Sequence, residues 1–387
     1  MFIRTLEKKL KVLFEKYPIV GVMGPRQSGK TTLVRNAFPH LDYVNLENLD
    51  LRQLAQEDPR GFLKRYNGVI LDEVQNVPEL FSYLQTISDV NDKPSQFVLT
   101  GSHNFLLFEK IAQSLAGRIA LTTLLPLSYK ELANPCDVFT AIQKGFYPRM
   151  HRYDISHNDF YSNYTSTYVE RDVRQITNVT DLSLFQKFIK LCAGRIGQVI
   201  NFTSLAMDCG ISQPTAKKWM SILESSYLMY LVQPYHENFN KRLIKNPKLY
   251  FYDTGLACYL LGIEDPQQLE WHSMRGELFE NLVFSETYKF FYAQGKQPPV
   301  FFWRNQSGVE IDMIIERAEG IIPVEVKSGQ TVRNDFFNNL RYLEALTEIR
   351  ESFLVYSGQD RLTFKNTQII PWESLESSLE TMELNTI

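Results

Sequence analysis

The sequence predicts an α/β fold that begins with a parallel sheet, continues with a mostly helical region and ends with a second, smaller α/β unit. Three observations support this prediction. Residues 24–31 have the pattern G-x-x-x-x-G-K-T between a short apolar run and a helical pattern. Short apolar runs then alternate with helical patterns to about residue 124. After residue 275, a long apolar helical pattern precedes three strand-like runs. Alternating strands and helices are typical of a parallel sheet that helices cover on both faces.

Residues 24–31 read as a phosphate-binding loop, or P-loop. Its glycines let the backbone approach phosphate oxygens, and successive N–H groups then bind the anion. Lys30 is expected to reach the β- and γ-phosphates, and the Thr31 hydroxyl to bind Mg²⁺. The following helix adds the partial positive charge of its N-terminus. We therefore expect ATP to be bound by Gly24, Pro25, Arg26, Gln27, Ser28, Gly29, Lys30, Thr31 and Thr32.

Two carboxylates follow one of the predicted strands. Besides residues 18–23, the strand-like runs are residues 43–46, 68–71, 97–100 and 119–124. Ligands of parallel sheets bind at the carboxyl ends of the strands, which is where Asp72 and Glu73 lie. Asp72 would coordinate Mg²⁺, and Glu73 would polarise the attacking water, as ATP hydrolysis requires. The alternative is an acidic turn on the surface.

Other polar residues near this edge are weaker candidates for catalysis. Ser102 and Asn104 follow the run at 97–100 and could sense the γ-phosphate or position water, unless they only cap a turn. Arg118 precedes the last run and could stabilise phosphate charge, in its own chain or in a neighbour; the alternative is a surface arginine.

The order of these pieces resembles AAA-type P-loop ATPases (the AAA/ASCE arrangement). The sequences of residues 24–33, 71–75, 99–102 and 248–256 are similar to those of prokaryotic AAA-type ATPases that carry a C-terminal domain of unknown function, the 4143 type. The resemblance covers nearly the whole chain and implies an ATPase, without a defined biological process. Residues 168–173 also resemble this family, and Arg171 there could act on the nucleotide of a neighbouring chain; a salt-bridged linker helix is the alternative.

The middle of the chain predicts a winged helix-turn-helix. Helical patterns at 184–193, 202–208 and 212–225 precede strand-like runs at 227–233 and 249–253. In a DNA-binding module, the second helix of the pair would place Gln213, Thr215, Lys217 and Lys218 against the major groove or phosphates. The basic wing would be Lys241, Arg242, Lys245 and Lys248. The alternative is a winged helix used for packing or for contacts with a protein partner.

The last unit has an acid on one strand and E-x-K on the next. Strand-like runs at 300–303, 309–315 and 322–327 follow a helix at 275–292, and alternation places Glu325 and Lys327 on one face. Asp312 and Glu325 could hold a second divalent metal, with Lys327 positioning a water. Glu280 could add a carboxylate, with Glu277 as second choice. This arrangement resembles the PD-(D/E)XK nuclease core, which also persists in domains that do not cut.

Composition sets outer limits on the class of protein. The 387 residues are 44% apolar, with net charge −3, and are enough for two or three domains. The patterns above predict domains at 1–150 (ATPase), 151–180 (linker helix), 181–262 (winged helix) and 263–387 (nuclease-like). The four cysteines lack metal-ligand or disulfide spacing, and no run approaches the length of a membrane span. We expect a cytoplasmic protein without membrane contact.

Two functions remain open from the sequence. The first is an ATPase that couples ATP binding and hydrolysis to DNA binding or processing. The second is a nucleotide-dependent switch or scaffold that recruits a protein partner, with an inactive nuclease-like domain. Either could work as a homo-oligomer.

Overall fold

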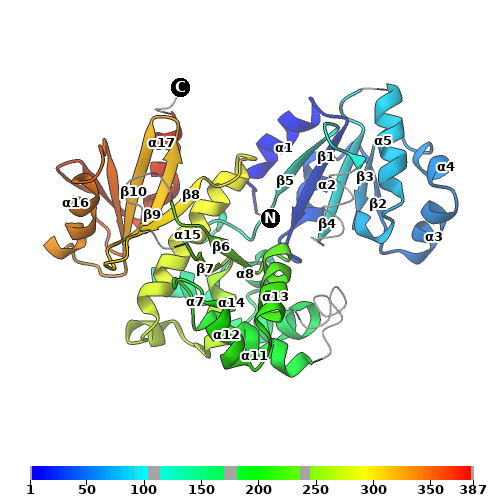
Figure 1. Cartoon of the computed structure of the whole chain (residues 1–387). Coiled ribbons are helices and arrows are strands. Elements are labelled where there is room, and N and C mark those ends of the chain that lie inside the picture. Colours follow the sequence, from blue (N-terminus) through cyan, green and yellow to red (C-terminus); the bar gives the residue numbers. More distant parts are fainter. Residues whose placement is uncertain (1, 92, 103–113, 170–180, 236–244, 385–387) are drawn as a thin grey trace.

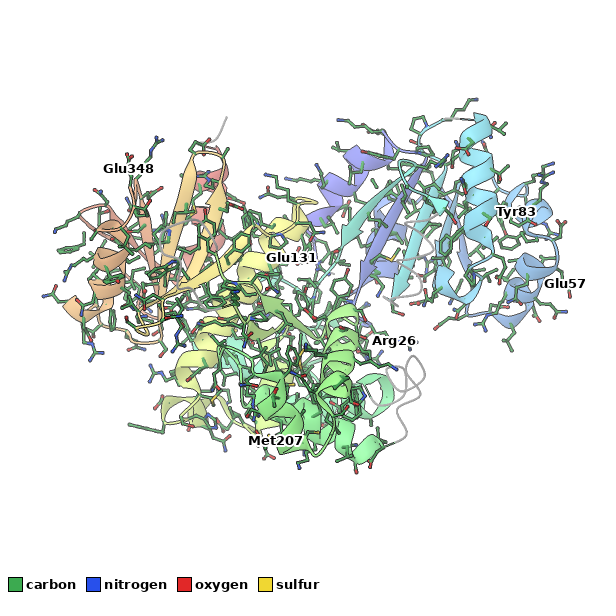
Figure 2. All side chains as sticks on the ribbon, viewed as in Figure 1. Arg26, Glu57, Tyr83, Glu131, Met207 and Glu348 are labelled. Carbon is green, nitrogen blue, oxygen red and sulfur yellow. The ribbon has the colours of Figure 1, made fainter. Side chains whose placement is uncertain are left out.

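The structure is a computed structural model and describes residues 2–91, 93–102, 114–169, 181–235 and 245–384. Figure 1 shows two bodies side by side. The first carries a five-stranded sheet near the N-terminus, and the second carries a two-stranded and a six-stranded sheet. Arg26 and Glu131 lie along the junction between the two bodies (Figure 2). The junction therefore runs close to the predicted P-loop.

The first sheet is parallel, as predicted. Its order is β2 (Asp42–Asn45), β3 (Val69–Asp72), β4 (Phe97–Ser102), β1 (Ile19–Gly24) and β5 (Ile119–Thr123). Every neighbouring pair runs in the same direction. The predicted strands are confirmed, with ends shifted by a few residues. Because β4 lies between β1 and β3, the segments that leave these three strands meet at one edge of the sheet.

Helices cover both faces of this sheet, as alternation along β1 requires. Ile19 and Met23 face one core, while Val20 and Val22 face the other. The first core includes side chains of α3 (Leu49–Glu57), α4 (Pro59–Leu63) and α5 (Leu80–Asn91). The second includes those of α1 (Leu6–Phe14) and α2 (Lys30–Ala37). A short 3-10 turn, Val74–Asn76, follows β3.

The second body begins with a group of helices. They are α7 (Val138–Lys144), α8 (Pro148–Tyr153), α9 (His157–Tyr164), α11 (Leu182–Ala193), α12 (Phe202–Cys209), α13 (Gln213–Ser225) and α14 (Thr254–Leu261). A π-helical turn, Thr165–Val169, extends α9, and 3-10 turns cover Tyr129–Glu131 and Pro266–Glu270. Residues 170–180 of the predicted linker helix, including Arg171, lie outside the described residues.

The predicted helix pair and hairpin are present. Helices α11 to α13 precede an antiparallel pair formed by β6 (Met229–Val232) and β7 (Lys248–Phe251). Ser212 caps α13, because its side chain accepts a hydrogen bond from the Thr215 N–H at 3.2 Å.

The C-terminal unit is a six-stranded sheet with helices on both faces. The order is β12 (Leu362–Phe364), β13 (Thr367–Pro371), β11 (Ser352–Tyr356), β10 (Gly320–Lys327), β9 (Glu310–Arg317) and β8 (Val300–Arg304). Helices α15 (Arg275–Ala293) and α17 (Leu375–Leu384) contribute to the core on one face, and α16 (Asn338–Glu344) to the core on the other. Two 3-10 turns, Asn334–Phe337 and Trp372–Ser374, precede α16 and α17.

The largest core of the second body extends from Leu125 to Met382 and includes one face of the C-terminal sheet, whereas the other face of that sheet packs in a separate core with α16. Residues 125–150, which we assigned to the first domain, pack in the largest core through side chains such as Leu127, Ile142 and Met150. All four cysteines are free thiols. Among the described helices, none combines the length and apolar character that crossing a membrane requires.

Candidate active site

The P-loop leaves the carboxyl end of β1 through a glycine that the fold requires. Gly24 has φ +150°, and a Cβ atom there would lie 2.1 Å from the carbonyl oxygen of Leu124. The chain then turns into α2 at Gly29, whose φ of +94° is in the left-handed region that favours glycine. The N-terminus of α2 consequently points into the loop, as a phosphate site requires.

Lys30 lies at the centre of the loop and is nearly buried, with 6% of its surface exposed. Its ammonium donates hydrogen bonds to the carbonyl oxygens of Gly24 at 3.0 Å and Pro25 at 2.8 Å. Burial lowers the pKa of Lys30 to about 8, although the Glu73 and Asp72 carboxylates oppose this shift. Burial therefore disfavours the positive charge of Lys30 that would bind phosphate.

We expect the affinity for ATP to fall as the pH rises above about 8. Below this pH, Lys30 is already protonated in the free protein; above it, ATP binding must be accompanied by proton uptake. Each further pH unit should then weaken binding by up to about tenfold. Calorimetric titration of ATP from about pH 7 to about pH 9.5 measures this effect, with Lys30→Ala as the baseline. Equal affinity across that interval would contradict the prediction.

Asp72 is placed where a nucleotide-bound magnesium ion would need it. Its carboxylate accepts hydrogen bonds from the hydroxyls of Thr31 at 2.9 Å and Tyr43 at 2.7 Å, and also from Thr100. Burial, together with Asp72 itself, raises the pKa of Tyr43, so its hydroxyl stays a donor. The Thr31 and Asp72 oxygens are hard ligands in contact across two elements, and so fit Mg²⁺. When bound, the ion would neutralise phosphate charge.

Glu73 is held in a fixed orientation beside Asp72. Its backbone is left-handed, with φ +55°, which is uncommon for a residue other than glycine and is found at functional sites. Its carboxylate accepts hydrogen bonds from the Ser102 hydroxyl at 3.2 Å and the Ser102 N–H at 3.4 Å, and from the Gln75 amide. Gln75 also donates to the Ser102 hydroxyl at 3.2 Å. Ser102 therefore acts on Glu73, together with Gln75, which was not among the predicted site residues.

A cavity of about 540 Å³ adjoins the P-loop and is lined by both bodies. The P-loop and α2 contribute Arg26, Gln27, Gly29, Lys30, Thr31, Thr32, Leu33 and Asn36, and Glu73 follows from the strand edge. The N-terminal segment contributes Phe2, Arg4 and Glu7, and the second body contributes Leu127, Pro148, Arg149, Arg152, Tyr153 and Thr167. A ligand bound here would contact both bodies.

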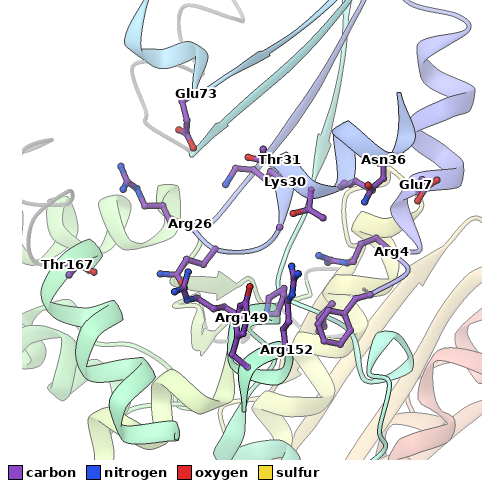
Figure 3. A pocket seen from close by; sticks show the side chains of 18 residues that line it. Arg4, Glu7, Arg26, Lys30, Thr31, Asn36, Glu73, Arg149, Arg152 and Thr167 are labelled. Carbon is purple, nitrogen blue, oxygen red and sulfur yellow. The ribbon is translucent and has the colours of Figure 1, made fainter. Parts of the chain in front are cut away.

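Arg149 and Arg152 were not predicted from the sequence. They come from α8 and line the side of the cavity that faces the P-loop (Figure 3). Both are exposed, and both guanidinium groups lie within 6 Å of the Tyr153 ring, at 5.7 and 5.2 Å from its centroid. Two cations facing Lys30 across a cavity suit a polyanion such as a nucleotide polyphosphate. No motif marks them, because their role depends on how α8 packs.

The in-cis role considered for Arg118 does not fit the structure. Arg118 precedes β5, and its carbonyl accepts a hydrogen bond from the N–H of Ile19, at the amino end of β1. The P-loop leaves the opposite end of β1, and Arg118 instead pairs with Asp89. An action on a neighbouring chain stays a prediction. Asn104 lies outside the described residues.

Some of the predicted DNA-contacting residues are exposed in the structure, and others are not. Gln213, Lys217 and Lys218 are exposed on α13, and Thr215 is half-buried beside the Ser212 cap. Lys245 is exposed, whereas Lys241 and Arg242 lie outside the described residues. Lys248 is a correction, because only 1% of it is exposed and it pairs with Glu280 at 3.0 Å and Glu310 at 2.5 Å. It cannot belong to a basic wing.

The C-terminal carboxylates are close together but are bound by lysines. Lys327 pairs with Asp312 at 3.0 Å and Glu325 at 2.5 Å, and Glu280 accepts hydrogen bonds from Lys248 and from the Tyr250 hydroxyl at 2.5 Å. Glu277, the second choice, is half-buried on the first turn of α15. Within the described ranges, no group of three or more His, Cys, Asp or Glu side chains is arranged to hold a metal. The predicted second metal site is therefore not found.

Three family models match successive parts of the chain. Residues 16–133 match an AAA domain, residues 137–267 match the domain of unknown function DUF8612, and residues 275–375 match the domain of unknown function DUF4143. The first match contains the P-loop, Asp72 and Glu73. The division near residue 135 lies within the segment that joins β5 to α7.

Individual relatives are similar along most of their length. An uncharacterized protein of Mycobacterium tuberculosis is 27% identical over 371 residues, which cover 95% of this chain and 82% of the relative. An uncharacterized protein of Haemophilus influenzae is 24% identical over 344 residues, which cover 79% of this chain and 81% of that protein. Among solved structures, a Walker-type ATPase of Pyrococcus abyssi is 14% identical with a TM-score of 0.39, covering 67% of this chain and 96% of that one.

The site geometry and the AAA match agree on the first body. A P-loop, a buried lysine, a threonine–aspartate pair and an oriented glutamate lie at one edge of a parallel sheet. Together, these findings support an AAA-type P-loop ATPase that ends in a C-terminal domain of the DUF4143 type.

Proposed function

We propose that this protein is a Mg²⁺-dependent ATPase in which the nucleotide controls how the second body is held against the first. The observation that carries this proposal is the cavity lined by Lys30 and Thr31 from one body and Arg149 and Arg152 from the other. A triphosphate would be attracted to Lys30 in the first body and to Arg149 and Arg152 in the second, and loss of its γ-phosphate would weaken that attraction. Binding and hydrolysis then favour different arrangements of the two bodies.

DNA binding is the proposed output of this change. Helices α12 and α13 contact each other and precede the β6–β7 pair, which is the element order of a winged helix-turn-helix. The exposed face of α13 carries Lys217 and Lys218, for which the structure records no ion pair among the described residues. These lysines are free to contact phosphates. DNA cleavage is not part of the proposal, because lysines already neutralise the C-terminal carboxylates.

A labelled DNA duplex tests this proposal by fluorescence anisotropy, without nucleotide and with ATP or ADP. Glu73→Gln serves to keep ATP intact during the measurement. We expect ATP to change DNA affinity and Lys217→Ala/Lys218→Ala to weaken it, with a smaller salt dependence because two phosphate contacts are lost. Lys64→Ala is the matched control, since Lys64 is exposed in the first body.

Lys30→Ala completes the experiment. It should lower ATP turnover by about 10² or more and remove the effect of ATP on DNA binding. Turnover at the wild-type rate in Lys30→Ala would contradict the ATPase assignment. Equal DNA affinity in all nucleotide states would instead reject DNA as the output, and favour the switch that recruits a protein partner.

A further inference from the structure

Arg4 is a buried arginine that connects the P-loop to the junction between the bodies. It lies just before α1, and 8% of it is exposed. Its guanidinium donates to the carbonyl oxygen of Ser28 at 2.7 Å and to that of Leu125 at 2.7 Å. The Nε–H donates to the carboxylate of Glu131 at 2.9 Å. One side chain thus joins the P-loop, the segment after β5 and the 3-10 turn at Tyr129–Glu131.

The contact with Ser28 fixes the direction of a phosphate-binding N–H. In a planar trans peptide, the C=O and the N–H point in opposite directions. The Ser28 carbonyl belongs to the same peptide as the Gly29 N–H, so holding the carbonyl toward Arg4 turns this N–H away from Arg4. In a P-loop, such backbone N–H groups bind the phosphates. Gly29 has no side chain to hold its own conformation, so an external contact is needed.

Glu131 links this peptide to the second body. Besides Arg4, its carboxylate accepts hydrogen bonds from the N–H groups of Thr5 at 2.7 Å and Ser128 at 3.1 Å. The neighbouring Tyr129 N–H donates to Glu286, on α15, at 2.7 Å. Because Arg4 and Glu131 both have side chains less than a tenth exposed, little water competes for these bonds. A shift of residues 125–131 would therefore move the Arg4 guanidinium, which is bound to Leu125 and Glu131.

We propose that Arg4 is a positioning residue of the phosphate site. Through the Ser28 carbonyl it orients the Gly29 N–H toward the phosphates, and through Glu131 it makes this orientation depend on residues 125–131. The second body thereby acts on nucleotide affinity through Arg4. This inference rests on the proposed function, because it requires a nucleotide at the P-loop.

Calorimetric ATP titrations of full-length variants test the role of Arg4. Arg4→Ala should weaken ATP binding about tenfold, because hydrogen bonds from a charged donor are lost at the loop. Arg4→Lys keeps the charge but not the fork of donors, and should fall between Arg4→Ala and the wild type. Glu131→Gln should also weaken ATP binding, although Glu131 contacts Arg4 rather than the loop. A purely local structural role would leave Glu131→Gln at wild-type affinity.

Arg195→Ala is the matched control. Arg195 also donates to a backbone carbonyl, that of Leu191 at 2.9 Å, and pairs with a carboxylate, that of Asp208, but it does not line the cavity. Thermal unfolding confirms that each variant is folded; if Arg4→Ala is not, Arg4→Lys and Glu131→Gln decide the outcome. Wild-type ATP affinity in the folded Arg4 variants would overturn the inference. If Lys30→Ala still abolished turnover in that case, the proposed ATPase would stand.

Discussion

Replacement of Glu73 by glutamine is expected to stop ATP hydrolysis while leaving ATP bound. Turnover should fall by about 10² to 10⁴, the range that a general base contributes. The dissociation constant for ATP should change little, since the binding groups of the P-loop are untouched. Glutamine has nearly the same shape as glutamate but cannot accept a proton from water.

The surroundings of Glu73 make this prediction specific. Ser102 and Gln75 hold its carboxylate, so the side chain is oriented before ATP arrives. In Glu73→Gln, the amide can keep one of these contacts through its oxygen, and the local fold should persist. Single-turnover measurements with radiolabelled ATP separate binding from cleavage.

Glu79→Gln is the matched control for this change. Glu79 is exposed, follows Glu73 by six residues and does not line the cavity. It should hydrolyse ATP at the wild-type rate. Normal turnover in Glu73→Gln would exclude Glu73 as the base and direct attention to another group at the edge of the sheet.

The nucleotide site could be predicted from sequence because its parts are local. The P-loop pattern contains Lys30 and Thr31 within one turn of helix, and Asp72 with Glu73 directly follows a buried strand. Parallel strands bring these segments to one edge, so spacing and fold class together place the residues. The contacts of Thr31 with Asp72 and of Ser102 with Glu73 follow from this placement.

Arg4, Arg149 and Arg152 could not be predicted, because their roles arise from packing between bodies. Arg4 reaches Glu131 across 127 residues of sequence, and no periodicity reports such a contact. Arg118 shows the opposite error. It precedes a strand, so it lies at the amino end of the sheet, away from the site.

Lys248 is the second residue whose replacement should have a large effect, here on stability. It follows several cations in sequence and so resembles a surface lysine, but it is buried between Glu280 and Glu310. Burial lowers the pKa of Lys248, but these carboxylates raise it by more, so the side chain stays protonated. It joins β7 to α15 and β9, and thereby attaches the hairpin to the C-terminal sheet.

Lys248→Met should therefore destabilise the second body by about 3–5 kcal/mol, because Glu280 loses its cation where it is largely buried, and Glu310 keeps only its pair with Arg304. Urea unfolding followed by tryptophan fluorescence measures this loss. All four tryptophans, Trp219, Trp271, Trp303 and Trp372, lie in the second body, so the signal reports that body alone. The first body should still bind ATP in the absence of urea.

Two further variants decide whether the loss comes from unpaired charge. Lys245→Met replaces an exposed lysine three residues earlier and should change stability by no more than about 0.5 kcal/mol. Adding Glu280→Gln and Glu310→Gln to Lys248→Met neutralises both carboxylates that faced Lys248 and should restore part of the stability. If Lys248→Met were as stable as Lys245→Met, the buried ion pairs would not hold the hairpin to the C-terminal sheet. A partial return of the unfolding free energy in the triple variant would show that Lys248 stabilises the hairpin by neutralising the charges of Glu280 and Glu310.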